Sequence, residues 1–218
     1  MKHMRPPVFD LECTRCPRLS AYLHDVKLKH PTYHARPVAP FGVADARLLV
    51  VGLAPGMHGA NATGRPFTGD HAGILLYQTL HKFGFASQPQ SVSATDQLKL
   101  LDCRISNAVK CLPPANKPTP AEVTHCRDYL VADLALLPSE AVVVALGRIA
   151  HEAVLRALGL RLRDYPFAHN RHHALNDGTL HLVDSYHCSR YNTQTRRLTT
   201  PMFEAVFGTA RTMLGDRA

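Results

Sequence analysis

Apolar positions along the chain gather in four short runs that are separated by amphipathic segments. Residues 48–51 form a continuous apolar run, the pattern of a strand that is buried on both faces. Further strands are predicted at residues 101–108, 141–146 and 179–185, and helices at residues 17–30, 71–83, 120–136, 147–158 and in a closing segment that ends near residue 214. This alternation predicts a mostly parallel four-stranded sheet with helices on both faces.

Capping signals define the start of the helix at residues 120–136. Thr119 is a candidate N-cap, Pro120 suits the first helical turn, and Glu122 completes a capping box. Residues 30–41, 86–97 and 187–200 lack periodicity and are predicted to be loops, whereas residues 161–173 receive no assignment.

The loop after the first strand, residues 52–70, is the first candidate for a functional site. Ligands of open parallel sheets bind at the carboxyl ends of strands. The loop offers backbone amides, the aromatic ring of Phe67 and the carboxylate of Asp70, an inventory that suits a small planar ligand. A phosphate-binding loop is disfavoured, because the segment has no Gly-Lys-Ser/Thr and its glycines do not fit G-x-G-x-x-G.

The composition of the chain predicts the number of domains and the kind of partner. A chain of 218 residues with 45% hydrophobic and 19% charged residues predicts one cored domain over residues 1–218. A net charge of +8 favours a polyanionic partner. No apolar run approaches the roughly 18 residues of a membrane span, and the N-terminus lacks an apolar signal core, so a cytoplasmic protein without a membrane partner is expected.

Four of the six cysteines have the spacing of a metal-ligand set. Cys13 and Cys16 form a C-x2-C pair, and Cys111 and Cys126 form a C-x14-C pair. Disulfides are not expected in a reducing compartment. Four thiolates suit either a tetrahedral zinc or an iron-sulfur cluster, and the wide second pair favours a cluster with a structural role. The alternative is four unrelated buried cysteines.

Three sequence blocks and these cysteines together resemble the family 5 uracil-DNA glycosylases, the type called B. The first block is GLAPGMHGANATGRPFTGD at residues 52–70, and the second is SNAVKCLPP at residues 106–114. The third is SYHCSRYNT at residues 185–193, followed by Leu-Thr at residues 198–199. The blocks span nearly the whole chain in the family's order.

The resemblance implies a three-layer α/β/α sandwich and an enzyme that flips uracil out of DNA and hydrolyses its N-glycosidic bond, with hypoxanthine and xanthine as further substrates. It also implies that Cys13, Cys16, Cys111 and Cys126 hold a [4Fe-4S] cluster, through which the N-terminal cysteine-bearing segment docks onto the domain. A monomer suffices for base flipping. Because no activated lysine is apparent for a Schiff base, the enzyme is expected to be monofunctional.

The base pocket is expected in the first two blocks. Gly52, Leu53 and Ala54 belong to the first motif. Phe67 offers a stacking face for a flipped base, with a core aromatic as an equal interpretation. Asn107 ends a strand, and its amide both donates and accepts, which suits the O4 and N3–H edge of uracil. The alternative for Asn107 is a turn asparagine that caps the strand.

Cleavage of the bond leaves positive charge on the sugar and negative charge on the departing base. His187 is expected to donate a hydrogen bond to the base oxygen as that charge develops. Related families carry a carboxylate or amide just after the first glycine of the motif, where this chain has Leu53 and Ala54. Asp70 is therefore a candidate for stabilising the water or the oxocarbenium ion, with an N-cap of the following helix as an equal alternative.

The loop that follows His187 is expected to enter the minor groove of DNA. Tyr191 is the candidate wedge for the gap that a flipped base leaves, and a solvated basic loop is the alternative. The candidate DNA contacts are Ser189, Arg190, Tyr191, Asn192 and Arg197.

The chain departs from the usual family pattern at three places. Cys188 stands where proline is frequent, Gly56-Met57 where two alanines are frequent, and Arg196 where glycine usually precedes Arg197. The change at 196 removes a residue that tolerates positive φ, so a re-aimed loop is expected.

Two other functions are compatible with the sequence. A non-catalytic iron-sulfur nucleic-acid-binding module of the same fold is kept open by the missing carboxylate after Gly52. A zinc-stabilised nucleotide-binding enzyme would require a colourless protein with stoichiometric zinc.

Overall fold

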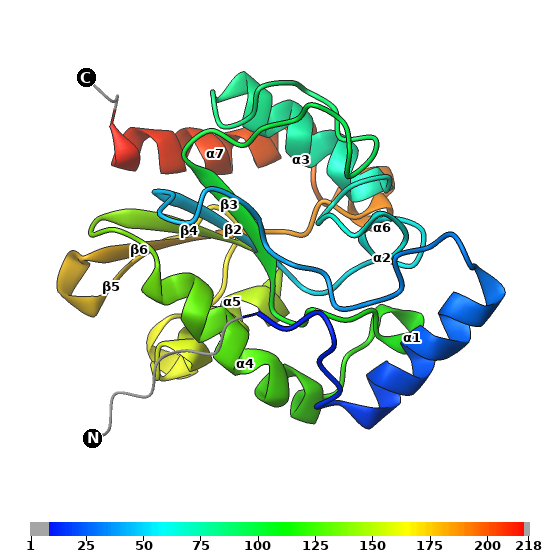
Figure 1. Ribbon diagram of the computed structural model, residues 1–218. Coiled ribbons are helices and arrows are strands. Elements are labelled where there is room, and N and C mark those ends of the chain that lie inside the picture. Colours follow the sequence, from blue (N-terminus) through cyan, green and yellow to red (C-terminus); the bar gives the residue numbers. More distant parts are fainter. Residues whose placement is uncertain (1–8, 216–218) are drawn as a thin grey trace.

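The computed structural model describes residues 9–215, and residues 1–8 and 216–218 of the expected domain lie outside that range. A six-stranded sheet lies between two layers of helices, which confirms the three-layer sandwich (Figure 1). The strand order is β1-β3-β2-β4-β6-β5, with four parallel inner strands and antiparallel pairing at both edges. The strands are β1 Phe41–Gly42, β2 Leu48–Gly52, β3 Cys103–Asn107, β4 Ala141–Leu146, β5 His172–Leu175 and β6 Leu180–Ser185.

The prediction of four strands is confirmed for the parallel centre of the sheet and wrong for its edges. The two additional strands pair antiparallel, Phe41 with Ile105 and His172 with Val183. β1 begins where a predicted loop ends, and β5 starts in the basic segment that received no assignment. Strands of two and four residues hold too few apolar positions for a period-2 signal, so pairing with the neighbouring strand decides them.

Helices α3 and α7 cover one face of the sheet, and α4 and α5 cover the other (Figure 1). All five predicted helices are present within a few residues of their expected bounds, and two short helices lie inside predicted loops. The helices are α1 Pro17–Lys29, α2 Ala60–Thr63, α3 His71–Lys82, α4 Pro120–Ala135, α5 Arg148–Ala157, α6 Arg190–Gln194 and α7 Thr200–Leu214, with 3-10 turns η1 Pro114–Asn116, η2 Leu162–Asp164 and η3 Asn176–Gly178.

The capping box of α4 is formed as its sequence predicts. The Thr119 hydroxyl accepts the backbone N–H of Glu122, and the Glu122 carboxylate accepts the backbone N–H of Thr119 at 2.7 Å. The box fixes the start of the helix that carries Cys126.

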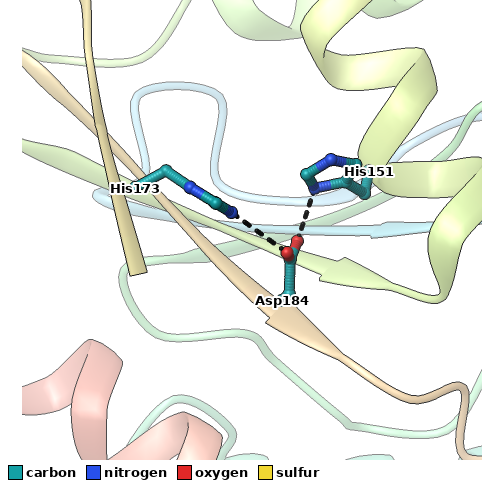
Figure 2. Close-up of side chains that lie close together, drawn as sticks. All are labelled: His151, His173 and Asp184. Carbon is teal, nitrogen blue, oxygen red and sulfur yellow. Dashed lines mark hydrogen bonds and ion pairs between the residues drawn. The ribbon is translucent and has the colours of Figure 1, made fainter. Parts of the chain in front are cut away.

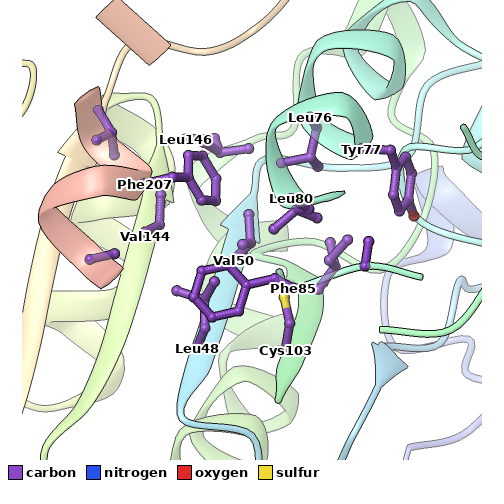
Figure 3. Close-up of a cluster of buried hydrophobic side chains, with 14 of the residues drawn as sticks. Leu48, Val50, Leu76, Tyr77, Leu80, Phe85, Cys103, Val144, Leu146 and Phe207 are labelled. Atoms are coloured by element: carbon purple, nitrogen blue, oxygen red, sulfur yellow. The ribbon is translucent and has the colours of Figure 1, made fainter. Parts of the chain in front are cut away.

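Strand β2 is buried along its whole length because both of its faces pack on helices. Leu48 and Val50 point to the cluster that includes Phe207 of α7 (Figure 3), and Leu49 and Val51 point to the cluster on the α4 and α5 side. Successive strand side chains alternate between faces, so a strand in the middle layer must be apolar at every position. The centre of the sheet is thereby a rigid support for the loops at its carboxyl end.

Helix α1 lies outside the sandwich, near the N-terminal end of α4 (Figure 1). Its buried residues Leu19, Leu23 and Val26 belong to a third cluster, which also contains Cys126 and Tyr129 of α4. This cluster brings the N-terminal segment next to α4. Among residues 9–215 there is no helix with the length and apolar content of a membrane span.

Candidate active site and cysteine centre

The parallel strands β2, β3 and β6 end at the same edge of the sheet, beside a cavity of about 380 Å³. His71 and Asn116, which sequence reasoning did not single out, also line this cavity. The predicted site residues in its wall are Leu53, Ala54, Phe67, Asp70, Asn107, His187, Ser189 and Arg190. Segments far apart in the sequence thus meet at one site, as expected for the strand ends of an α/β fold.

The side-chain amide of Asn107 is buried and incompletely hydrogen-bonded. Asn107 is 3% exposed, and its Oδ1 has no hydrogen-bond partner. Within residues 9–215, the only other buried side-chain nitrogen or oxygen in this state is Oδ1 of Asn61. Leaving a buried polar atom unpaired costs about 1–3 kcal/mol. This oxygen therefore does not cap the strand, which was the alternative interpretation of Asn107. It is available to a donor that enters the cavity.

Gly52 allows Asn107 and Phe67 to approach the end of β2. A Cβ atom at position 52 would lie 2.4 Å from Oδ1 of Asn107 and 2.7 Å from the ring of Phe67. Contacts this short are excluded for real side chains, so position 52 requires glycine. Gly52 itself lies behind the residues that line the cavity.

Phe67 belongs both to the core and to the cavity wall. The residue is 7% exposed and packs in the cluster between the sheet and α3. Its ring lines the cavity and stacks with the imidazole of His187 at a centroid distance of 6.1 Å. Its backbone has a φ of 53°, a left-handed conformation that is rare for an aromatic residue and typical of functional loops.

His187 follows β6 by two residues and presents an uncharged imidazole. Burial lowers the pKa of His187 to about 4, so the ring is neutral near pH 7. The side-chain amide of Asn192 donates a 2.8 Å hydrogen bond to the backbone carbonyl of His187 and fixes the start of the loop. His187 lines the cavity, and its contact to a bound ring stays a prediction.

Asp70 is the N-cap of α3, which confirms that interpretation. Its Oδ1 accepts the backbone N–H of Gly73 at 2.8 Å. The other oxygen lies against Gly59, where a Cβ atom would come within 2.5 Å of it. Burial raises the pKa of the Asp70 carboxyl above its ordinary value, although its hydrogen bonds oppose this effect. Asp70 also lines the cavity, so its role toward a ligand remains a prediction.

The predicted DNA-contact residues lie in and around α6. Ser189 caps this helix by accepting the backbone N–H of Asn192, and Arg190 reaches the cavity rim. Tyr191 is 70% exposed, the position that a wedge requires. The guanidinium of Arg197 lies 5.0 Å from the ring centroid of Tyr186.

The departure at Arg196 does not remove the left-handed turn from this loop. Arg196 adopts a φ of 56° itself. The arginine therefore takes the conformation for which glycine is usually chosen, at a cost in backbone energy.

The four predicted cysteine ligands meet at a separate small cavity between α1 and α4. Cys111 and Cys126 are buried, and Cys13 and Cys16 are half-buried. Sγ of Cys126 accepts the backbone N–H of Lys110 at 3.3 Å. Burial raises the pKa of the Cys111 and Cys126 thiols, so their thiolates require compensating positive charge.

A buried His-Asp-His cluster behind the end of β6 was missed by sequence reasoning (Figure 2). Nδ1 of His151 lies 2.7 Å from Oδ1 of Asp184, and Nε2 of His173 lies 3.2 Å from Oδ2. Nε2 of His151 lies 2.9 Å from the carbonyl oxygen of Tyr165. The cluster is thus a hydrogen-bond network in which imidazoles donate to oxygens. The sequence signal that could have revealed it is Asp184, a carboxylate inside a predicted strand, because a buried carboxylate needs hydrogen-bond partners.

The cavity at the strand ends combines an unpaired amide oxygen, an aromatic wall and a neutral histidine, groups that suit a planar heterocycle. The family model of the Uracil DNA glycosylase superfamily matches residues 39–211. The chain belongs to this superfamily.

Curated relatives specify the branch of the superfamily. The type-5 uracil-DNA glycosylase of Thermus thermophilus is 48% identical over 208 residues, which cover 93% of this chain and 94% of that protein. The type-5 uracil-DNA glycosylase of Pyrobaculum aerophilum is 42% identical over 87% of this chain and 83% of its own length. The type-5 enzyme of Mycobacterium tuberculosis is 39% identical over 93% of this chain and 78% of its own length. The resemblance to family 5 is confirmed.

Proposed function

We propose that this chain is a monofunctional uracil-DNA glycosylase, which flips uracil out of DNA and hydrolyses its N-glycosidic bond to leave an abasic site. The observation that carries the proposal is the unpaired Oδ1 of Asn107 in a cavity that also presents His187 and Phe67. The names of relatives at 39–48% identity support the same activity.

Asn107 is assigned the recognition of the base edge. Its Oδ1 accepts the N3–H of uracil, and its NH2 group donates to O4. Cytosine presents the opposite pattern, with a lone pair at N3 and an amino group at C4. The NH2 group of Asn107 would then face the amino group of cytosine, and Oδ1 would face the N3 lone pair, so neither hydrogen bond can form. Hypoxanthine and xanthine share the N–H and C=O edge, which makes them further substrates. Phe67 supplies the stacking face, Leu53 and Ala54 form the adjoining wall, and Gly52 makes room behind them for Asn107 and Phe67.

His187 is assigned the stabilisation of the departing base. The C1′–N1 bond breaks and its electron pair leaves with the base as an anion; water adds to C1′, and the proton it releases neutralises the departing base. The neutral ring of His187 donates its N–H toward O2, where negative charge grows. Asp70 is the carboxylate in the cavity wall, and we assign it to the water or the cationic sugar. Within residues 9–215 no lysine lines this cavity, which favours hydrolysis over a Schiff base.

The partner is DNA that contains deaminated bases. We assign Ser189, Arg190, Tyr191, Asn192 and Arg197 to its backbone and minor groove, with exposed Tyr191 as the wedge. The net charge of +8 supports this partner. The proposed protein is a cytoplasmic monomer with one domain over residues 1–218.

The cofactor proposed for the cysteine centre is a [4Fe-4S] cluster held by Cys13, Cys16, Cys111 and Cys126. The donor set suits it, since four sulfurs surround one cavity. A zinc ribbon would favour a second close C-x2-C pair, whereas Cys111 and Cys126 are fifteen positions apart, which favours a cluster. The cluster would supply positive charge to the buried thiolates and a cross-link between α1 and the 111–126 segment, which docks the N-terminal segment.

The proposal is tested by single-turnover incubation of the purified protein with a labelled duplex that holds one uracil opposite guanine, followed by alkali. Strand scission by the wild type and a roughly 10²–10³-fold slower rate for His187→Ala are expected. His24→Ala, on an exposed face of α1, is the matched control and should retain the rate. Binding without scission would replace the enzyme with the non-catalytic binding module of the same fold.

A further inference from the structure

A buried network of charged and polar side chains lies directly behind Asn107. Lys110 and Asp133 are 1% and 4% exposed. Nζ of Lys110 donates to Oδ2 of Asp133 at 2.8 Å and also contacts Oγ of Ser106. The Ser106 hydroxyl donates to the same carboxylate oxygen at 2.6 Å. The two residues that donate to Oδ2 of Asp133 therefore flank Asn107 in the sequence.

The ammonium group of Lys110 acts on Asn107 itself. It donates a 3.0 Å hydrogen bond to the backbone carbonyl of Asn107, three residues earlier. This bond closes the turn that follows β3. Because the amide of Asn107 makes no bond through Oδ1, the surrounding backbone has to fix the direction of that oxygen.

Helix α4 holds this turn at two points. Asp133 accepts the Lys110 side chain, and Sγ of Cys126 accepts the backbone N–H of Lys110 at 3.3 Å. Positions 126 and 133 are seven residues apart, about two helical turns, and so lie on one face of the helix. The turn that carries the base-reading amide is thus attached to the helix that carries a cysteine ligand.

We propose that Lys110 and Asp133 are positioning residues that fix Asn107 for recognition of the base. This inference rests on the proposed function of the cavity. A buried ion pair is a weak source of net stability, because desolvation offsets the attraction, and it is well suited to fixing a geometry. The ammonium group also donates to the backbone carbonyl of Asn107, which ties the side chain of Lys110 to the residue it positions.

Lys110→Met tests the proposal, because it keeps the length of the side chain and removes the donor. We expect single-turnover excision from a uracil duplex to slow about tenfold, the effect of one misaligned hydrogen bond. Binding of a duplex with a tetrahydrofuran abasic analogue should not change, because that ligand has no base for Asn107 to contact. In an Asn107→Ala background the same substitution should cost less than about twofold, since it acts through the lost amide.

Arg104→Met is the matched control. Arg104 approaches the other oxygen of Asp133 at 3.4 Å and does not touch the turn, so its removal should leave excision unchanged. If Lys110→Met fails to fold, Ser106→Ala removes the two bonds that Ser106 makes in the network, to Asp133 and to Lys110, and is expected to slow excision in the same direction. With the proposed cluster bound, its visible absorption should persist in every variant, which would report that α1 and α4 are intact.

Three results would overturn the inference. The first is a double variant in which the rate losses of Lys110→Met and Asn107→Ala multiply. The second is a loss of abasic-duplex binding in Lys110→Met as large as its loss of excision rate. The third is a loss of excision rate in Arg104→Met as large as in Lys110→Met. A wild type that binds uracil duplexes without excision overturns the proposed function instead. In that case the ratio of Kd values for uracil and abasic duplexes supplies the same test of Lys110.

Discussion

Asp133 and Asp184 are both buried carboxylates behind a residue of the candidate site, but they take their donors from different places. Asp133 reaches in from α4 and binds Ser106 and Lys110, which belong to the same segment as Asn107. Asp184 lies in β6, and its donors His151 and His173 come from α5 and β5. One network shapes a single turn, whereas the other ties three elements together. Base recognition should therefore depend on the first, and global stability on the second.

The largest expected effect breaks the network that ties three elements together. Asp184→Ala removes the acceptor that Nδ1 of His151 and Nε2 of His173 share, and leaves these buried nitrogens without that partner. Breaking a buried pair in this way costs about 3–5 kcal/mol, which urea denaturation measures as a loss of unfolding free energy. Asp164→Ala breaks an exposed pair with Arg161 and should cost less than about 1 kcal/mol. Equal losses of unfolding free energy in Asp184→Ala and Asp164→Ala would show that the Asp184 network does not support global stability.

A smaller loss of unfolding free energy is expected on acidification, and His187, which follows β6, should cause it. Burial lowers the pKa of His187 to about 4, below the ordinary value of about 6.5 for an unfolded chain. Between these values the unfolded state binds more protons. The contribution to stability is therefore complete above about pH 6.5 and decreases toward pH 4, by at most about 1.4 kcal/mol per pH unit.

Urea denaturation at pH 7 and pH 5 separates this contribution from other titrations. His187→Ala should show a shallower decrease than the wild type, because the titrating group is gone. His24→Ala, which removes an exposed imidazole, should follow the wild type. A decrease in His187→Ala as steep as in the wild type would assign the acid sensitivity to another group.

Sequence reasoning reached the elements whose signal is local. The strands β2 and β4 are marked by continuous apolar runs, and the start of α4 is marked by the capping box at Thr119. Each of these signals depends only on residues close together in the sequence, and the structure contains all three elements. The strand β5 could not be found in this way, because its pairing with β6 decides its conformation. Local patterns thus predict the middle layer and leave the edges to tertiary contacts.

The candidate site shows the same division. Asn107 and His187 were found because a family motif marks them, and the cavity contains both. Lys110 lies in the second sequence block, residues 106–114, yet its partner Asp133 is 23 residues away on another element. No period or spacing connects them. A lysine in a buried segment signals only that a partner exists, because a buried ammonium group needs a counter-charge.

The smallest expected effect compares the loops that follow the two strands. Arg196 after β6 and Ala115 after β3 both have left-handed backbones, with φ of 56° and 53°. Glycine at either position removes a strain of about 1–2 kcal/mol and loses part of that gain to the greater freedom of the unfolded chain. Arg196→Gly and Ala115→Gly should each stabilise the protein by about 0.5–1 kcal/mol, seen as a higher Tm. Arg197→Gly should lower the Tm, because it removes the contact with Tyr186 and relieves no such strain. A lower Tm for Arg196→Gly would mean that the arginine side chain contributes more than its backbone costs.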